Sequence, residues 1–264
     1  MWLFKVKNLQ AGSIEVYRGS LSATLPRIEG YKVGSHPIIV DLLKAFICEK
    51  PRQYKLAPKW SVDHVLLFLE KWGLNSNLSL KMITLKLSML LALSSASRCA
   101  ELAFLDEKNM IYKPGGIEFT LTRHKKNRKS SILPGKMFFP ELDNKPILCP
   151  VKCLQDYLVR TSKLKTDNSI IIRSFIKPHK AVLPRTISKW LTSLIFQAGG
   201  FNPKDMAGRN MGHSTRSVSS SKAMNAGMTT LEVLEAAEWK SENVFSKFYY
   251  NKSNFGRTVL TMAD

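Results

Sequence analysis

The spacing of apolar residues predicts a mainly helical chain. Ile14, Val16, Leu21 and Leu25 lie at helical spacing within residues 13–25. Further helices are predicted after His36-Pro37, at 61–73, at 80–93, where one side of the helix is almost entirely apolar, and at 101–105. Ser61 is placed to cap its helix and Gly73 to end it.

One segment has the period of a half-buried strand instead. Ile117, Phe119 and Leu121 alternate with polar residues. The basic string RHKKNRK, residues 123–129, ends this strand, and residues 130–133 are placed to pair back. The pattern therefore predicts a hairpin with a basic tip.

The last hundred residues are again helical in pattern. Helices are predicted at 150–158, 187–198, 213–226 and 231–239, with a short one before Tyr249. Pro150 suits a first turn, Thr186 and Thr230 are expected caps, and Gly199 and Gly227 are expected stops. Helices with one small group of strands indicate an α+β fold that is mainly α-helical.

The organisation of the chain follows from residues 51–60, which have two prolines, several basic residues and no apolar period. We interpret them as a linker between a helical domain at 1–50 and a larger domain at 61–264.

Composition adds a partner class. The 264 residues include 40 Lys and Arg against 20 Asp and Glu, a formal net charge of +20. This excess favours a polyanionic partner, above all nucleic acid, and the 44% hydrophobic content argues against disorder. Charge alone does not separate an enzyme from a basic RNA-binding protein.

Other classes are disfavoured. The longest apolar run, near Met89–Leu93, is far below the roughly 20 residues of a membrane helix, and the N-terminus lacks a signal-peptide pattern. Cys149 and Cys153 are one residue too far apart for a CxxC pair, and no second ligand pair accompanies them. We therefore expect an intracellular protein with buried free thiols, no metal and no cofactor.

Phosphate-binding chemistry is suggested by two short motifs. His213 and Arg216 are three residues apart on one predicted helix, so both can face one phosphate. Arg98 ends the most apolar helix, where a charge needs a partner, and Glu101 is placed to orient it. A solvated helix face and a structural Arg–Glu pair are the alternative interpretations.

The basic hairpin and the C-terminal tyrosines extend this chemistry. A hairpin lysine can donate a proton to a leaving oxygen, and the tip can contact DNA phosphates through Arg123, Lys126, Arg128 and Lys129. Tyr249 or Tyr250 can act as a nucleophile if a base and cations lie nearby. Plain electrostatics and a core aromatic stripe with Phe245 and Phe248 are the alternatives.

Taken in their order along the chain, these motifs resemble the tyrosine recombinases, the phage-integrase family, and most closely those of DIRS-type and Crypton-like eukaryotic elements. R-x-x-E-L, HSTRS and W-x-S-x-x-x-F-x-x-F-Y carry the resemblance, which covers nearly the whole chain. It implies a catalytic domain with a small antiparallel sheet, preceded by a helical, SAM-like core-binding domain. That domain usually has about four helices, and some 50 residues hold roughly two, so we expect a truncated one.

The resemblance also implies residue roles. Arg98 matches the first catalytic arginine and Glu101 its acidic companion. His213 and Arg216 match the H-x-x-R pair, and Trp239 stands where the family has His or Trp.

Two further roles have alternatives. Lys125 matches the hairpin lysine, with Lys126 as the alternative. Tyr249 matches the nucleophile, with Tyr250 as the alternative.

The implied reaction cleaves and rejoins DNA through a 3′-phosphotyrosine, without metal or cofactor. The implied partner is double-stranded DNA, bound by a homotetramer in the nucleus during integration of a mobile element. A domesticated or decayed, non-catalytic DNA-binding protein is the main alternative, and a type IB topoisomerase is a weaker one.

Overall fold

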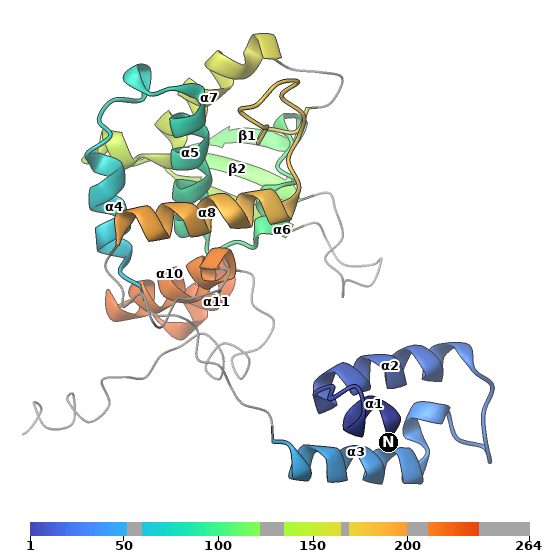
Figure 1. The fold of residues 1–264 in the computed structure, drawn as a ribbon. Coiled ribbons are helices and arrows are strands. Elements are labelled where there is room, and N and C mark those ends of the chain that lie inside the picture. The colour runs from blue at the N-terminus through green and yellow to red at the C-terminus, as the bar shows by residue number, and fades with distance from the viewer. Residues whose placement is uncertain (52–59, 122–134, 165–168, 200–210, 238–264) are drawn as a thin grey trace, which may run out of the picture. The chain divides into compact units, whose positions relative to one another are not determined.

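The computed structural model describes residues 1–51, 60–121, 135–164, 169–199 and 211–237. The chain divides into two compact units, Met1–Leu56 and Ala57–Asp264, and each is described by itself (Figure 1). The predicted linker lies almost wholly outside the described residues.

The N-terminal unit is helical. The predicted helices at 13–25 and after Pro37 are confirmed, and a short first helix was not predicted. Phe4 and Phe46 stack with ring centroids 4.2 Å apart, and Ala11 and Leu43 complete the buried cluster. This core is small even for so short a unit. The helices are α1 (Trp2–Lys5), α2 (Ala11–Thr24) and α3 (Pro37–Glu49), with a 3-10 turn, η1, at Val33–Ser35.

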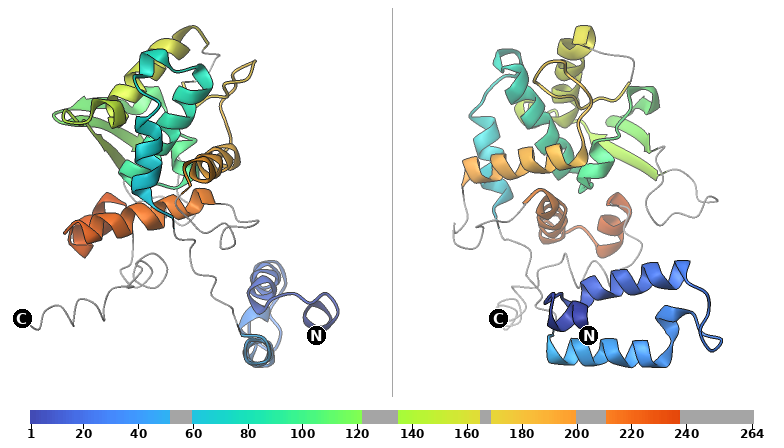
Figure 2. Two further views of the ribbon diagram at one scale, coloured as in Figure 1. Left: turned by 60° about the vertical axis from the view of Figure 1, so that its left-hand side comes forward. Right: turned by 45° about the vertical axis from the view of Figure 1, so that its right-hand side comes forward.

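The core of the larger unit is built around helix α5 (Leu80–Ser95). Residues 83 to 92 of this helix are all buried, including the polar Thr84, Lys86 and Ser88. Helix α5 contacts α6, α7, α8, α10 and the sheet (Figures 1 and 2). The surrounding helices are α4 (Val62–Glu70), α6 (Cys99–Leu102), α7 (Pro150–Thr161), α8 (Pro184–Ala198), α10 (Ser214–Asn225) and α11 (Thr230–Ala236). None of the helices described here is long and apolar enough to cross a membrane.

The helix ends agree with local sequence signals in most places. Ser61 Oγ accepts a hydrogen bond from His64 N, as expected of a cap. Two predicted caps are wrong. Helix α8 begins at Pro184 rather than after Thr186, because proline suits the first turn. Helix α11 is capped by Thr229, which forms a capping box with Glu232, rather than by Thr230. Helix α6 begins at residue 99 rather than 101.

A three-stranded antiparallel sheet covers one side of the unit, in the order β1-β2-β3. The predicted strand is confirmed as β2 (Gly116–Leu121), with Ile117 and Phe119 buried. Its described partners are β1 (Met110–Lys113), which was not predicted, and β3 (Gly135–Pro140). The predicted pairing of residues 130–133 and the basic tip lie outside the described residues.

Three of the four thiols are buried, namely Cys99, Cys149 and Cys153, while Cys48 is exposed, so the expectation of buried thiols is wrong for Cys48. Cys153 lies beside the side chain of Lys86, which is 0% exposed and donates to the carbonyl of Gly73 over 3.0 Å. Desolvation lowers the pKa of Lys86. Desolvation also raises the pKa of the Cys153 thiol from 9.0 to about 12.

The raised pKa of Cys153 predicts alkaline sensitivity. The folded protein keeps the thiol proton where the unfolded chain loses it, so this stabilisation is complete below the unfolded pKa and is lost as pH rises through about 12. Between pH 8 and pH 10 the wild type should lose about 1 kcal/mol more unfolding free energy than Cys153→Ala. Urea unfolding at both pH values measures this, with Cys48→Ala as the control. Equal losses in wild type and Cys153→Ala would contradict it.

Candidate functional site

The first part of the site follows helix α5. Ala96 ends that helix in a left-handed conformation, with φ of 47°, and turns the chain so that Arg98 becomes the N-cap of α6. The Glu101 carboxylate accepts from Arg98 N over 2.8 Å and from Arg98 Nη1 over 2.9 Å. The side chain of Arg98 remains 47% exposed. The predicted contact between Glu101 and Arg98 is therefore present, and it holds the arginine while leaving it partly exposed. The orienting role of Glu101 stays a prediction.

The second part is the segment that carries His213 and Arg216. A 3-10 turn, η6 (Met211–His213), leads directly into α10. The His213 side chain is exposed, and no described residue hydrogen-bonds its imidazole. Arg216 is only 3% exposed and donates from Nη1 to the carbonyl of Ala96 and from Nη2 to that of Ala237, each over 2.7 Å. Arg216 therefore connects the turn at Ala96, just before Arg98, with the end of α11.

Helix α8 supports this segment from the other side. Thr192 Oγ1 accepts from the backbone N–H groups of Met211 and Gly212, over 2.9 and 3.1 Å. Gly212 packs directly against Ser188, so closely that a Cβ at Gly212 would lie 2.6 Å from Ser188 Cα and 2.7 Å from its carbonyl oxygen. Only glycine allows this approach. Helix α8 thereby sets where η6 and His213 lie.

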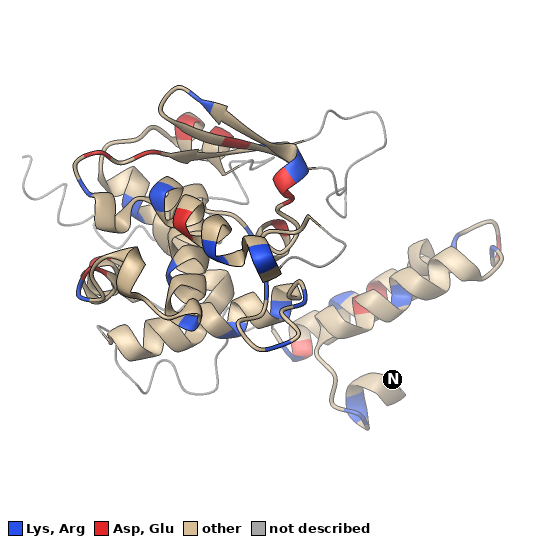
Figure 3. Ribbon diagram, turned by 90° about the horizontal axis from the view of Figure 1, so that it is seen from above, with Lys and Arg blue, Asp and Glu red and all other residues tan. Residues whose placement is uncertain are grey.

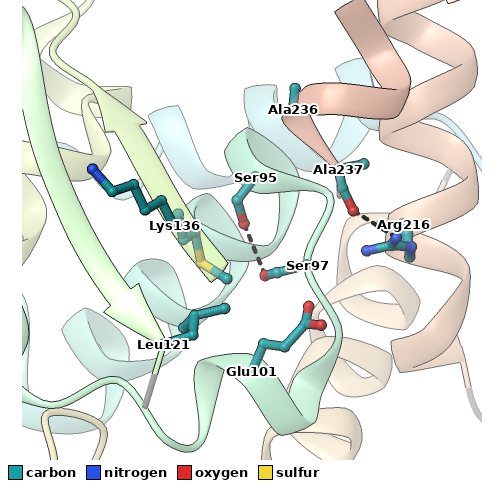
Figure 4. Close-up of a pocket in the computed structure, with 9 residues that line it drawn as sticks. Ser95, Ser97, Glu101, Leu121, Lys136, Arg216, Ala236 and Ala237 are labelled. Atoms are coloured by element: carbon teal, nitrogen blue, oxygen red, sulfur yellow. Dashed lines mark hydrogen bonds between the residues drawn. The ribbon is translucent and has the colours of Figure 1, made fainter. Parts of the chain in front are cut away.

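A small pocket opens where these segments meet the sheet (Figure 4). Ser97, Glu101 and Arg216 form its polar wall, and Leu121 and Lys136 contribute from strands β2 and β3. The guanidinium of Arg216 at this wall suits an anion such as a phosphate oxygen, since its planar fork donates several hydrogen bonds.

Lys136 is a pocket residue that was not predicted. Its Nζ pairs with Glu118 Oε1 over 3.1 Å, and Figure 4 shows the amine pointing away from Arg216. No motif in the sequence distinguishes Lys136 from the other lysines, because its place in the pocket results from the pairing of β2 with β3.

The structure brings Arg98, Glu101, His213 and Arg216 onto neighbouring segments. The other predicted site residues lie outside the described part of the chain: Arg123, Lys125, Lys126, Arg128, Lys129, Trp239, Tyr249 and Tyr250. Two of the segments that carry them nevertheless begin at the pocket. Leu121 and Ala237 both line it. Lys125 is four residues beyond Leu121, and Trp239 two beyond Ala237.

Lys and Arg residues lie on several helices of the larger unit, not on one alone (Figure 3). Opposing carboxylates pair with some of them, as Asp63 does with Lys222 on neighbouring helices.

Comparisons with known proteins identify the fold. No protein-family model matches the sequence, and no curated protein matches it. Among solved structures, the XerH site-specific recombinase in a post-cleavage complex with a palindromic difH substrate is 14% identical, with a TM-score of 0.59 over 97% of this chain and 74% of that chain. XerA recombinase is 16% identical, with a TM-score of 0.55 over 96% and 82%. A lambda integrase dimer bound to a COC′ core site is 13% identical, with a TM-score of 0.53 over 94% and 62%.

At these identities the likeness concerns the fold alone. The arrangement of helices around a three-stranded antiparallel sheet matches the catalytic domain of tyrosine recombinases, so the predicted fold class is confirmed. The DIRS-type or Crypton-like subtype stays a prediction.

The contact between Gly212 and Ser188 predicts the effect of one methyl group. Gly212→Ala should lower the free energy of unfolding by about 2–3 kcal/mol, because the backbone of Ser188 cannot rotate away as a side-chain tip would. Gly19→Ala is the control, since a Cβ there meets nothing within 4 Å. Urea unfolding of both variants tests this, and a Gly212→Ala protein as stable as the control would contradict the close approach.

Proposed function

We propose that this chain cleaves and rejoins DNA strands through a 3′-phosphotyrosine intermediate, in the recombination or integration of a mobile element. One observation carries the proposal. The segments bearing Arg98 and Arg216 meet at a pocket that is also lined by Leu121 and Ala237, which in the sequence are four residues before Lys125 and two before Trp239. The tyrosine-recombinase fold supports the same interpretation.

In the proposed reaction the phenolate of Tyr249 attacks the phosphorus of a DNA phosphodiester. The bond from Tyr249 to phosphorus forms as the bond to the 5′-oxygen breaks, so the number of phosphate esters is unchanged. Arg98 and Arg216 stabilise the negative charge on the non-bridging oxygens, which is the largest expected contribution to rate. Arg98 suits this role because Glu101 orients it while leaving it exposed.

Proton transfers complete the step. Lys125 protonates the leaving 5′-oxygen, and His213 assists removal of the Tyr249 proton and positions the phosphate. Trp239 packs against the phosphate and donates its indole N–H. Rejoining reverses these transfers when a 5′-hydroxyl attacks the phosphotyrosine, so the sequence of steps balances without ATP or a metal ion.

The partner we propose is double-stranded DNA, in keeping with a net charge of +20. Residues 1–50 would act as a small core-binding domain, 51–60 as the linker and 61–264 as the catalytic domain. From the sequence resemblance we further propose a homotetramer on paired sites, a nuclear location and a DIRS-type or Crypton-like subtype.

A second function is favoured by the N-terminal unit. Among its described residues the buried cluster consists of Phe4, Ala11, Leu43 and Phe46, a small core for a domain that must hold DNA during strand exchange. In this second function the chain binds DNA without cleaving it.

The nucleophile is tested with nicked duplex DNA, which traps the covalent intermediate because the cleaved strand diffuses away. Wild type should form a protein–DNA adduct that resists denaturing electrophoresis. Tyr249→Phe should abolish it, since phenylalanine has no hydroxyl, while Tyr250→Phe should retain it.

The reverse pattern would move the nucleophile to Tyr250. Specific DNA binding without any adduct would favour the non-catalytic function. A pool of random duplexes, enriched first by binding, supplies the target sequence for both measurements.

The orienting role of Glu101 gives a second test. Glu101→Ala removes the acceptor of two Arg98 hydrogen bonds, so adduct formation should slow by roughly 10- to 100-fold, as expected for losing bonds to a charged group. Glu118→Ala is the matched control, because Glu118 pairs with Lys136 and not with a proposed catalytic residue. Single-turnover adduct assays compare the two. Equal rates in both variants would refute the orienting role.

A further inference from the structure

Trp60 is the last residue of the predicted linker and the first described residue after 52–59, and its indole ring is buried at 6% exposure. The Nε1–H group donates to the hydroxyl of Ser214 over 2.7 Å. Ser214 is the first residue of α10 and lies between His213 and Arg216 in sequence. This hydrogen bond therefore links Trp60, near the start of the larger unit, to the segment that carries the His213 and Arg216 side chains.

The hydrogen bond continues beyond Ser214. An indole N–H can only donate, so the Ser214 hydroxyl must accept it and donate onward. It donates to the carbonyl of Met211 over 2.6 Å. Met211 and Ser214 are the residues on either side of Gly212 and His213, so the relay closes the η6 turn around His213.

The His213 side chain is exposed. The backbone that carries it is held by the relay on one side and by Thr192 on the other. Helix α4, which begins just after Trp60, also contacts α10 (Figure 1).

From these contacts we infer that Trp60 is a positioning residue for phosphoryl transfer, acting on His213 and Arg216 through its hydrogen bond to Ser214. This inference rests on the proposed function. The bond is buried, so losing the Ser214 hydroxyl leaves the indole N–H without its acceptor, and losing the indole removes the bond that links Trp60 to this segment. The segment would relax, and the imidazole would leave the orientation that the transition state needs.

The test combines variants on both sides of the bond. Trp60→Phe removes the donor and Ser214→Ala removes the acceptor. Ser214→Ala also removes the hydrogen bond to the Met211 carbonyl. Trp60→Phe should therefore slow adduct formation at saturating nicked DNA by about tenfold and Ser214→Ala by at least as much, both with unchanged DNA affinity. The double variant should be no slower than Ser214→Ala alone, because that variant already lacks the bond to the indole. Trp72→Phe is the matched control, because Trp72 is a partly buried indole packed on the same core.

A measurement that does not depend on catalysis separates a positioning role of Trp60 from a general effect on the stability of the fold. Amide hydrogen exchange of the full chain should quicken at residues 211–217 in Trp60→Phe and Ser214→Ala, and stay unchanged at α5. Exchange that quickens equally in α5, or unchanged exchange with unchanged adduct rates, would overturn the inference. If wild type forms no adduct, the proposed function fails, and the exchange measurement still decides whether Trp60 holds this segment.

Discussion

The buried guanidinium of Arg216 is the interaction on which the arrangement of the site depends. It is 3% exposed, and its donors reach the carbonyls of Ala96 and Ala237. A buried arginine keeps its charge, so the two carbonyls that accept from Nη1 and Nη2 offset much of the cost of burying it. Three segments, the loop after α5, the start of α10 and the end of α11, are held together because one side chain needs acceptors from two of them.

The same hydrogen bonds stabilise the fold and orient the site. Helix ends leave backbone N–H groups without intrahelical partners, and Glu101 satisfies one of these at Arg98 while holding the Arg98 side chain. Thr192 does likewise for Met211 and Gly212. Because these residues act at the ends of packed helices, the functional side chains rest on a rigid support rather than on long loops.

The elements that sequence analysis misplaced or missed each have their own physical cause. A proline and a threonine near the start of α8 are both common at helix N-termini, and the helix begins at Pro184. At the start of α11 two adjacent threonines are each of a residue type that caps helices. Only Thr229 has a glutamate three residues later that completes a capping box. Strand β1 is short and mostly exposed, so it has no apolar alternation, and its pairing with β2 forms it.

The sequence by itself determined the elements whose signals are local. The apolar run made α5 a buried helix, the alternation at 117–121 made β2, and the three-residue spacing of Arg98 and Glu101 joined their side chains. Only the tertiary structure decided which distant residues support the site. Arg216 bonds to Ala96 across 120 residues, and Trp60 to Ser214 across 154. Such pairs have no periodicity or fixed spacing, because packing around α5 brings them together, and packing depends on the whole chain at once.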